Sequence, residues 1–221
     1  MSEGRLIIGT KRYSSWSLRG WLAVRMAGLD VEEVVIPLAG TGPGSTPAIA
    51  AATPGGQVPA LEHRGAWVWE SSAICEYCAE LAPNLWPADR ATRAWARSIS
   101  AQMHAGFRGL RSSMPMNLGR GFPGRGRTPE ALADIAAVEA IWARALAAHG
   151  GPFLFGRDFS LGDVMFAPVV ARFLTWQPEL SATSRGYIEA VRAYPLVARW
   201  YAEAAAEPAA WLLSNYENPP S

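Results

Sequence analysis

The sequence predicts two structural units in tandem, a small α/β domain followed by an all-helical domain. Strand and helix signals alternate in the order β-α-β-α-β-β-α between residues 5 and 81, which is typical of a domain that packs helices on a sheet. A proline-bearing stretch follows at 82–89, and beyond it the apolar residues recur at helical spacing. We therefore expect domains at 1–81 and 90–221, joined by a linker at 82–89.

Turn residues bound each expected element of the first domain. In chain order we expect a buried strand at 5–10, an amphipathic helix at 17–28, a strand at 32–38, a weak helical turn at 45–56, two strands within 58–71 and a helix at 72–81. Gly28 is suited to end the first helix. Arg64-Gly65 is suited to the turn between the two paired strands.

The second domain contains four segments whose apolar residues follow a helical period. They predict helices at 90–114, 129–150, 160–176 and 185–207. Pro115 and a loop rich in Gly, Arg and Pro should end the first of these, and Pro129 is well placed as a first helical residue. Pro168 and Pro195 should kink or interrupt the last two.

The composition excludes several classes of protein. Half of the residues are apolar and 10% are aromatic, so disorder is not expected. A net charge of +1 gives no global reason to expect a nucleic-acid partner. No apolar run approaches the roughly 20 residues that span a bilayer. Two cysteines and no secretory signal predict a reducing cytoplasm and no membrane partner.

Cys75 and Cys78 form a C-x-x-C pair inside a segment with helical periodicity. No second cysteine pair or histidine cluster completes a metal site, so we expect no metal. A redox pair would stand just after a strand, where a helix N-terminus lowers a thiol pKa. We therefore interpret both cysteines as packed side chains.

The stretch KRYSSWSLRGW places a serine cluster between the first expected strand and the first expected helix. One of Ser14, Ser15 and Ser17 should cap that helix, because serine is a preferred N-cap residue. A helix N-terminus also stabilises an anion, to which a hydroxyl can donate. The cluster alone leaves both roles open.

Two further stretches allow a ligand-binding role beside a structural one. In GGQVPALEHRG a cis proline at Pro59 would make a tight turn that exposes the Val58 main chain to an extended, peptide-like ligand; the alternative is a plain turn. In WESSAI, Ser71 or Ser72 is suited to cap the next helix. Ser71 and free helical N–H groups could also hold a carboxylate while Glu70 holds an amine, as an amino-acid head group requires.

Together, these motifs resemble those of a known protein family. SSWSLR, GQVPAL, ESSAICEYCAEL and SLGDVMFAPVV occur in the order found in the cytosolic glutathione transferases, which have a thioredoxin-like domain followed by a helical domain. The resemblance spans residues 5–220. The first motif is most similar to the SSCSWR of the zeta class, with Trp16 at the position of the cysteine.

The resemblance implies a glutathione site built from all three stretches. Ser14 would hydrogen-bond the glutathione sulfur, with Ser15 as the alternative. Val58 would pair with the cysteinyl part, and Glu70 and Ser71 would bind the γ-glutamyl amine and carboxylate. The implied glutathione-binding residues are Ser14, Trp16, Gln57, Val58, Pro59, Glu70 and Ser71. Gln57, Ser45 and Thr46 are candidates for the glycine carboxylate, and Ser160 with Asp163 matches a capping box with a folding role.

For the second substrate we expect a pocket in the helical domain. Its candidate residues are Met103, His104, Phe107, Arg108 and Arg111, together with Trp211 near the C-terminus. Arg108 and Arg111 lie three residues apart, on one expected helical face with His104. That face could be a solvated arginine surface or a positive wall suited to an anionic second substrate.

The function implied is that of a glutathione transferase acting on an electrophilic small molecule, without a metal and as a homodimer. Lowering a thiol pKa by two units requires about 2.7 kcal/mol. A hydroxyl hydrogen bond to a charged group supplies about 1.5–3 kcal/mol, and a helix N-terminus adds about 1 kcal/mol. The alternatives are a maleylacetoacetate isomerase-like enzyme, a glutathione-dependent reductase or dehalogenase, and a non-catalytic glutathione-binding scaffold.

Overall fold

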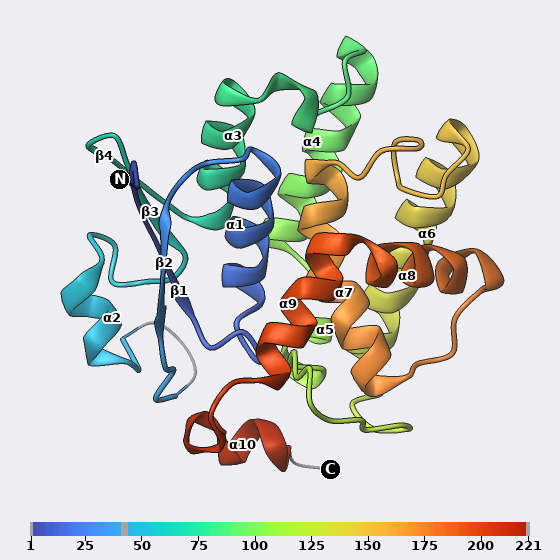
Figure 1. The fold of residues 1–221 in the computed structure, drawn as a ribbon. Coiled ribbons are helices and arrows are strands. Elements are labelled where there is room, and N and C mark those ends of the chain that lie inside the picture. Colours follow the sequence, from blue (N-terminus) through green and yellow to red (C-terminus); the bar gives the residue numbers. More distant parts are fainter. Residues whose placement is uncertain (1, 41–43, 220–221) are drawn as a thin grey trace.

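A mixed four-stranded sheet forms the centre of the N-terminal part (Figure 1). The computed structural model describes residues 2–40 and 44–219, so the outermost residues of the two predicted domains lie outside it. The strands are β1 (Gly4–Gly9), β2 (Glu32–Ile36), β3 (Ala60–His63) and β4 (Ala66–Trp69). Their order is β2-β1-β3-β4; β1 and β2 are parallel, and the other two pairs are antiparallel.

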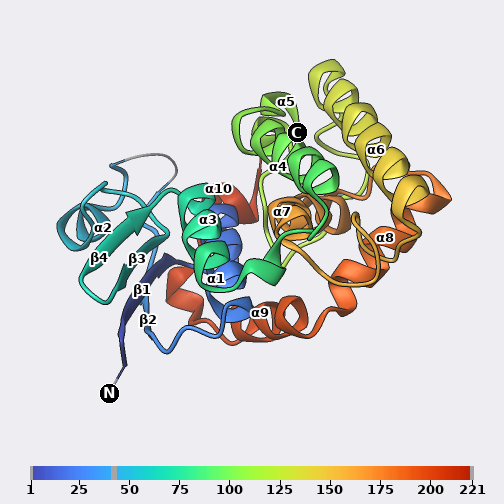
Figure 2. The same cartoon turned by 90° about the horizontal axis from the view of Figure 1, so that it is seen from above.

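Helices cover both faces of this sheet. α1 (Ser15–Met26) and α3 (Ser71–Leu81) lie between the sheet and the C-terminal helices, and α2 (Pro47–Ala52) lies on the opposite face (Figures 1 and 2). The predicted α/β order is therefore confirmed. The expected turn at Arg64-Gly65 is confirmed as well: both residues have positive φ, 50° and 83°, which suits a two-residue hairpin turn.

The C-terminal part is helical throughout. It contains α4 (Arg90–Ala105), α5 (Arg108–Ser113), α6 (Pro129–His149), α7 (Leu161–Trp176), α8 (Ala182–Ala193), α9 (Pro195–Ala205) and α10 (Ser214–Glu217), with 3-10 turns at Pro83–Leu85 and Ala209–Trp211. α7 lies at the centre of these helices (Figure 2). Its apolar residues belong to a hydrophobic cluster that runs on through α1 and the sheet. None of the helices within 2–40 and 44–219 is long and apolar enough to cross a membrane.

Capping explains where two of these helices start. Pro129 is the first residue of α6, as predicted, and Thr128 caps it by accepting from the Ala131 N–H. The capping box before α7 is confirmed too: Asp163 is fully buried and accepts from the Ser160 N–H and hydroxyl, each at 2.9 Å. Both caps satisfy N–H groups that a helix start otherwise leaves without partners.

The single helix predicted at 90–114 is wrong. α4 ends at Ala105, Phe107 turns into the left-handed region with φ 59°, and α5 starts at Arg108. Gly106 lowers the helix propensity at the break. The turn buries Phe107 in the core. It also lets α5 approach α6 so closely that a Cβ on Gly109 would stand 2.6 Å from the backbone of Glu130. Tertiary packing therefore outweighs the continuous helical pattern.

The two proline predictions have different outcomes. Pro195 separates α8 from α9 and is the first residue of α9, which confirms the predicted interruption. At Pro168 the sequence predicted a kink or an interruption, and the interruption does not occur, because α7 runs unbroken from Leu161 to Trp176. Nearly every residue of α7 is buried, so packing on all sides compensates for the N–H group that proline lacks.

Cys75 and Cys78 are free and buried in α3, as the sequence predicts. Burial raises the pKa of the Cys75 thiol and raises that of Cys78 to about 12. Both therefore stay protonated near neutral pH and act as small apolar side chains.

Candidate functional site

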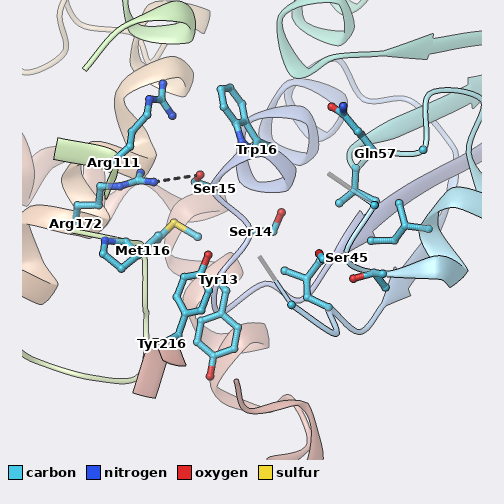
Figure 3. A pocket seen from close by; sticks show the side chains of 18 residues that line it. Tyr13, Ser14, Ser15, Trp16, Ser45, Gln57, Arg111, Met116, Arg172 and Tyr216 are labelled. Atoms are coloured by element: carbon cyan, nitrogen blue, oxygen red, sulfur yellow. Dashed lines mark hydrogen bonds between the residues drawn. The ribbon is translucent and has the colours of Figure 1, made fainter. Parts of the chain in front are cut away.

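A cavity of about 270 Å³ opens where the N-terminal sheet meets the C-terminal helices. The end of the loop from β1 to α1 and the first two residues of α1 supply its floor, from Tyr13 to Trp16. Figure 3 shows Ser45 and Gln57 on one side of that floor and Arg111, Met116 and Arg172 on the other. The cavity therefore has one wall from the α/β part and one from the helical part.

Ser14 is the N-cap of α1 and lines this cavity. Its Oγ accepts from the Ser17 N–H at 3.3 Å and donates to the Ser17 Oγ at 2.7 Å. The Ser17 Oγ in turn accepts from the Gly9 N–H at 3.0 Å. The predicted cap is thus Ser14, and its hydroxyl stands at a helix N-terminus on the wall of a cavity.

Ser15 is the first residue of α1 and lines the same cavity. Its Oγ accepts from the Arg172 Nη2 at 3.3 Å, and the Arg172 Nη1 donates to the Pro168 carbonyl at 3.1 Å. Burial lowers the pKa of Arg172 to about 9, with a smaller contribution from Arg111. Arg172 is therefore still protonated at neutral pH, and it joins α7 to the start of α1.

Arg111 reaches the cavity by folding back from α5. Its Nε donates to the Gly106 carbonyl at 2.9 Å, and its Nη2 donates to the Met103 carbonyl. Its guanidinium lies 4.7 Å from the centre of the Trp16 ring. Burial lowers the pKa of Arg111 to about 10, so this side chain also keeps its charge at neutral pH.

The other predicted pocket residues do not line the cavity. Met103 and Phe107 are buried in the core, and Arg108 is exposed. His104 lies beside Glu70, with 3.8 Å between Nε2 and the carboxylate. The helical face predicted for His104, Arg108 and Arg111 does not exist, because the helix ends at Ala105. Trp211 is half-buried on a 3-10 turn and also lies outside the cavity lining.

The residues predicted to bind glutathione separate into two groups. Trp16, Gln57 and Val58 line the cavity together with Ser45 and Thr46. The Val58–Pro59 bond is cis, as expected. Pro59, Glu70 and Ser71 are not in the lining.

The start of α3 differs from the prediction. Its N-cap is Glu70, with φ 66°, so the prediction that Ser71 or Ser72 caps this helix is wrong. Ser71 is the first helical residue, and its buried Oγ has no hydrogen-bond partner among the described residues. The Glu70 side chain is 50% exposed. The second helix N-terminus in this region therefore has a buried, unpartnered hydroxyl beside a half-exposed carboxylate that lies 3.8 Å from the His104 Nε2.

The C-terminal segment closes one side of the cavity. The Tyr13 hydroxyl donates to the Glu217 carboxylate at 2.7 Å and accepts from the Leu213 N–H at 3.3 Å. The rings of Tyr13 and Tyr216 lie 4.8 Å apart, and both line the cavity. Burial, with the bond to Glu217, raises the pKa of Tyr13. The tyrosine hydroxyl is thus engaged with Glu217 and is not free to serve a ligand.

Sequence reasoning missed Tyr13, Met116, Arg172 and Tyr216. The sequence contains a signal that could have identified Arg172. It is a charged residue inside the apolar stretch VVARFLTW, so it should need a specific partner. Tyr216 had none, since only the path of the C-terminal segment brings it to Tyr13. Among the residues that the structure describes, no group of three or more His, Cys, Asp or Glu side chains is placed to hold a metal.

Comparisons with known proteins agree with this arrangement. The family model "Glutathione S-transferase, N-terminal domain" matches residues 13–81, and "Glutathione S-transferase, C-terminal domain" matches residues 125–203. Maleylacetoacetate isomerase from Rattus norvegicus is 30% identical over 185 residues, which cover 82% of this chain and 84% of that protein.

Two solved structures share the fold. The theta class glutathione S-transferase from Xanthomonas axonopodis pv. citri, with glutathione bound, is 27% identical with a TM-score of 0.65, over 91% of this chain and 98% of that one. Maleylacetoacetate isomerase from Anaeromyxobacter dehalogenans has dicarboxyethyl glutathione and citrate in its active site. It is 25% identical with a TM-score of 0.65, over 95% of this chain and 96% of that one. By its sequence motifs, its fold and these matches, the chain belongs to the cytosolic glutathione transferase family.

Proposed function

We propose that this protein binds glutathione in the cavity and stabilises its thiolate for reaction with an electrophilic small molecule. The observation that carries the proposal is the position of Ser14, whose hydroxyl caps α1 on the cavity wall. The Ser14 hydroxyl, which donates to the Ser17 Oγ, would turn to donate to a sulfur placed there, and the sulfur would also lie in the favourable potential of a helix N-terminus. Ser15 is the alternative donor.

In this proposal the predicted domain 1–81 holds glutathione and the predicted domain 90–221 supplies the electrophile side. The cysteinyl part would pair with the main chain of Val58. The γ-glutamyl carboxylate would take the unpartnered Ser71 hydroxyl and the N–H groups of α3, and its amine would take Glu70. Gln57, Ser45 and Thr46 remain the candidates for the glycine carboxylate.

The chemistry needs no further group from the protein. The thiol releases its proton to solvent, because a hydrogen bond of about 1.5–3 kcal/mol to the thiolate favours the ionised form. The thiolate then attacks an electrophilic carbon. A sulfur–carbon bond forms, and the bond to the leaving group breaks with its electron pair on that group.

A second candidate reaction is glutathione-dependent cis–trans isomerisation. It is favoured by the two guanidinium groups in the cavity, the half-buried Arg111 and the buried Arg172, because their charges suit an anionic substrate. It is also favoured by the name of the rat relative, maleylacetoacetate isomerase. Here the thiolate would add to a carbon of the cis double bond. Rotation and elimination of the same thiolate would then give the trans product, so glutathione is regenerated.

Two measurements test the proposal. Ultraviolet difference absorbance should show a thiolate when glutathione binds at neutral pH, where a free thiol is only a few per cent ionised. Turnover should then be measured with chlorodinitrobenzene for conjugation and with a cis enedione for isomerisation. Glutathione that binds without thiolate absorbance and without turnover would instead identify a non-catalytic scaffold.

The Arg172→Gln variant is expected to lower kcat/KM about tenfold for an anionic electrophile and to have a smaller effect for a neutral one. The physical reason is the loss of one buried cation from the cavity, and hydrogen bonds to charged groups contribute about 1.5–3 kcal/mol. Chlorodinitrobenzoate and chlorodinitrobenzene form the matched pair of substrates. Equal losses for the two would show that Arg172 only supports Ser15.

The proposal extends to the assembly and location that the family resemblance implies, a homodimer in the cytoplasm. The two free thiols in α3 fit a reducing compartment. Sedimentation of the purified chain would measure the state of assembly directly.

A further inference from the structure

The Trp16 side chain lies in contact with two guanidinium groups. The guanidinium of Arg111 is 4.7 Å from the centre of the ring, and that of Arg19 is 4.8 Å away. The His104 ring meets the indole edge-on at 5.1 Å. Two cations at these distances from one indole are within the range of cation–π attraction. Trp16 therefore has electrostatic contacts that no aliphatic side chain could replace.

The edge and the face of the Arg111 guanidinium are held by different groups. Carbonyls at the end of α4, those of Met103 and Gly106, accept hydrogen bonds from its nitrogens. The indole of Trp16 packs against the group and lines the cavity beside it (Figure 3). Trp16 thus fixes the orientation of a side chain that the α4 carbonyls hold only along its edge.

The charges around Arg111 favour its departure from this position. Arg19 is fully buried and donates its Nε to the Met165 carbonyl, while its two terminal nitrogens have no hydrogen-bond partner within the described part of the chain. Burial, Arg111 and Arg172 all lower the pKa of Arg19. Asp134 of α6 attracts Arg111. Without the indole, repulsion from Arg19 and Arg172 would favour a shift of the Arg111 guanidinium away from them.

We propose that Trp16 is a specificity-determining residue, which holds the Arg111 guanidinium against the cavity so that electrophiles carrying a carboxylate or another anionic group are preferred. This inference rests on the proposed function, because it assigns a role on the electrophile side of the same cavity. Trp16 acts through Arg111 and is therefore a positioning residue.

The test compares two electrophiles that differ by one carboxylate, chlorodinitrobenzoate and chlorodinitrobenzene. In both, the thiolate displaces chloride from an activated ring carbon. The ratio of their kcat/KM values cancels any effect of Trp16 on glutathione itself. Trp16→Leu should lower the anionic-to-neutral ratio about tenfold, which is about 1.4 kcal/mol. The change should lie in KM for the benzoate. Trp16→Phe retains an aromatic face and should keep most of the preference.

The matched control is the same substitution in a variant that lacks the guanidinium. When Trp16→Leu is added to the Arg111→Gln variant, the anionic-to-neutral ratio of kcat/KM should not change further, because the two residues act as one unit. An equal effect of Trp16→Leu in both backgrounds would overturn the inference. So would an equal loss for both electrophiles. Far-ultraviolet circular dichroism of each variant shows whether it folds. If Trp16→Leu does not fold, Trp16→Phe is measured in its place.

A binding measurement keeps the inference testable if the protein does not turn over. Calorimetry with the dinitrophenyl and carboxydinitrophenyl conjugates of glutathione should show the same tenfold change of ratio in Trp16→Leu. Thiolate absorbance without that change would refute the inference and leave the proposed function intact. Binding of neither conjugate by the unmodified protein would instead refute the proposed function, and with it this inference.

Discussion

Ser14→Ala should lower kcat/KM for chlorodinitrobenzene about 10- to 100-fold while glutathione affinity changes little. In the proposed mechanism the hydroxyl donates to the thiolate and not to the rest of the ligand. A hydrogen bond to a charged group is worth about 1.5–3 kcal/mol, and each 1.4 kcal/mol corresponds to a factor of ten. The pH dependence of kcat/KM should show the apparent pKa of the bound thiol moving up toward that of free cysteine.

Two control variants separate the hydroxyl from its structural role. Ser14→Ala also removes the N-cap of α1, which costs about 1 kcal/mol of stability. Ser14→Gly should keep most of that stability, since glycine at an N-cap costs only a few tenths of a kcal/mol, and it should lose as much activity as the alanine variant. Ser15→Ala is the matched comparison on the neighbouring residue. If it abolishes activity while Ser14→Ala does not, the thiolate partner is Ser15, backed by Arg172.

Local signals in the sequence correctly predicted a serine cap for the first helix, with Ser14 as one of three candidates, and the Arg64-Gly65 turn. In each case the residues that decide the structure lie within a few positions of one another. Ser14 accepts from Ser17 three residues along, and the hairpin turn needs only two residues that tolerate positive φ. Because such interactions are contained in a short stretch, the sequence pattern is sufficient to predict them.

The helical wall of the cavity could not be predicted in the same way. Arg172 meets Ser15 across 157 positions of the chain, and Tyr216 meets Tyr13 only because the C-terminal segment returns to the loop after β1. The end of α4 at Ala105 depends on the fit of Gly109 against Glu130. The pattern of residues 90–114 alone carries no trace of that contact, so it favoured one long helix and placed His104 beside Arg111.

Lys11→Met is expected to reduce the free energy of unfolding by about 3 kcal/mol. Lys11 is the only lysine of the chain, and its side chain is 6% exposed. It pairs with Glu33 of β2 and Glu203 of α9, and its ammonium group lies 5.6 Å and 5.4 Å from the ring centres of Trp21 and Trp200. Removing one member of a buried ion pair costs about 3–5 kcal/mol.

We expect a loss at the lower end of the range for buried ion pairs, because the carboxylates of Glu33 and Glu203 each keep a second cationic partner. Arg25 still pairs with Glu33 at 3.0 Å, and Arg199 still pairs with Glu203 at 2.7 Å. Urea unfolding measures the loss, and Arg5→Met is the matched control. Arg5 pairs with Glu62 at 2.7 Å, but both side chains are over 30% exposed, so this variant should lose less than about 1 kcal/mol.

The pH dependence distinguishes the loss of an ion pair from a loss of packing. Burial alone would raise the pKa values of Glu33 and Glu203, but hydrogen bonds from Lys11 and the neighbouring donors outweigh it and leave both lowered. The stabilisation is therefore complete above the ordinary glutamate value of 4.5 and disappears as the pH falls through the lower values of the folded state. The difference between Lys11→Met and the unmodified protein should shrink over the same interval. A packing defect would give a difference that does not change with pH.

Activity should survive Lys11→Met in the fraction that is folded. The loop that carries Ser14 is held by main-chain groups of Lys11, which the substitution leaves in place. The Lys11 N–H donates to Glu207 at 2.5 Å, and its carbonyl accepts from the Trp200 Nε1 at 3.1 Å. Both partners belong to the C-terminal helical part, so α9 and the residues just after it position the loop independently of the ammonium charge. A variant that is folded but inactive would show that the charge itself, and not the main chain, keeps Ser14 in place.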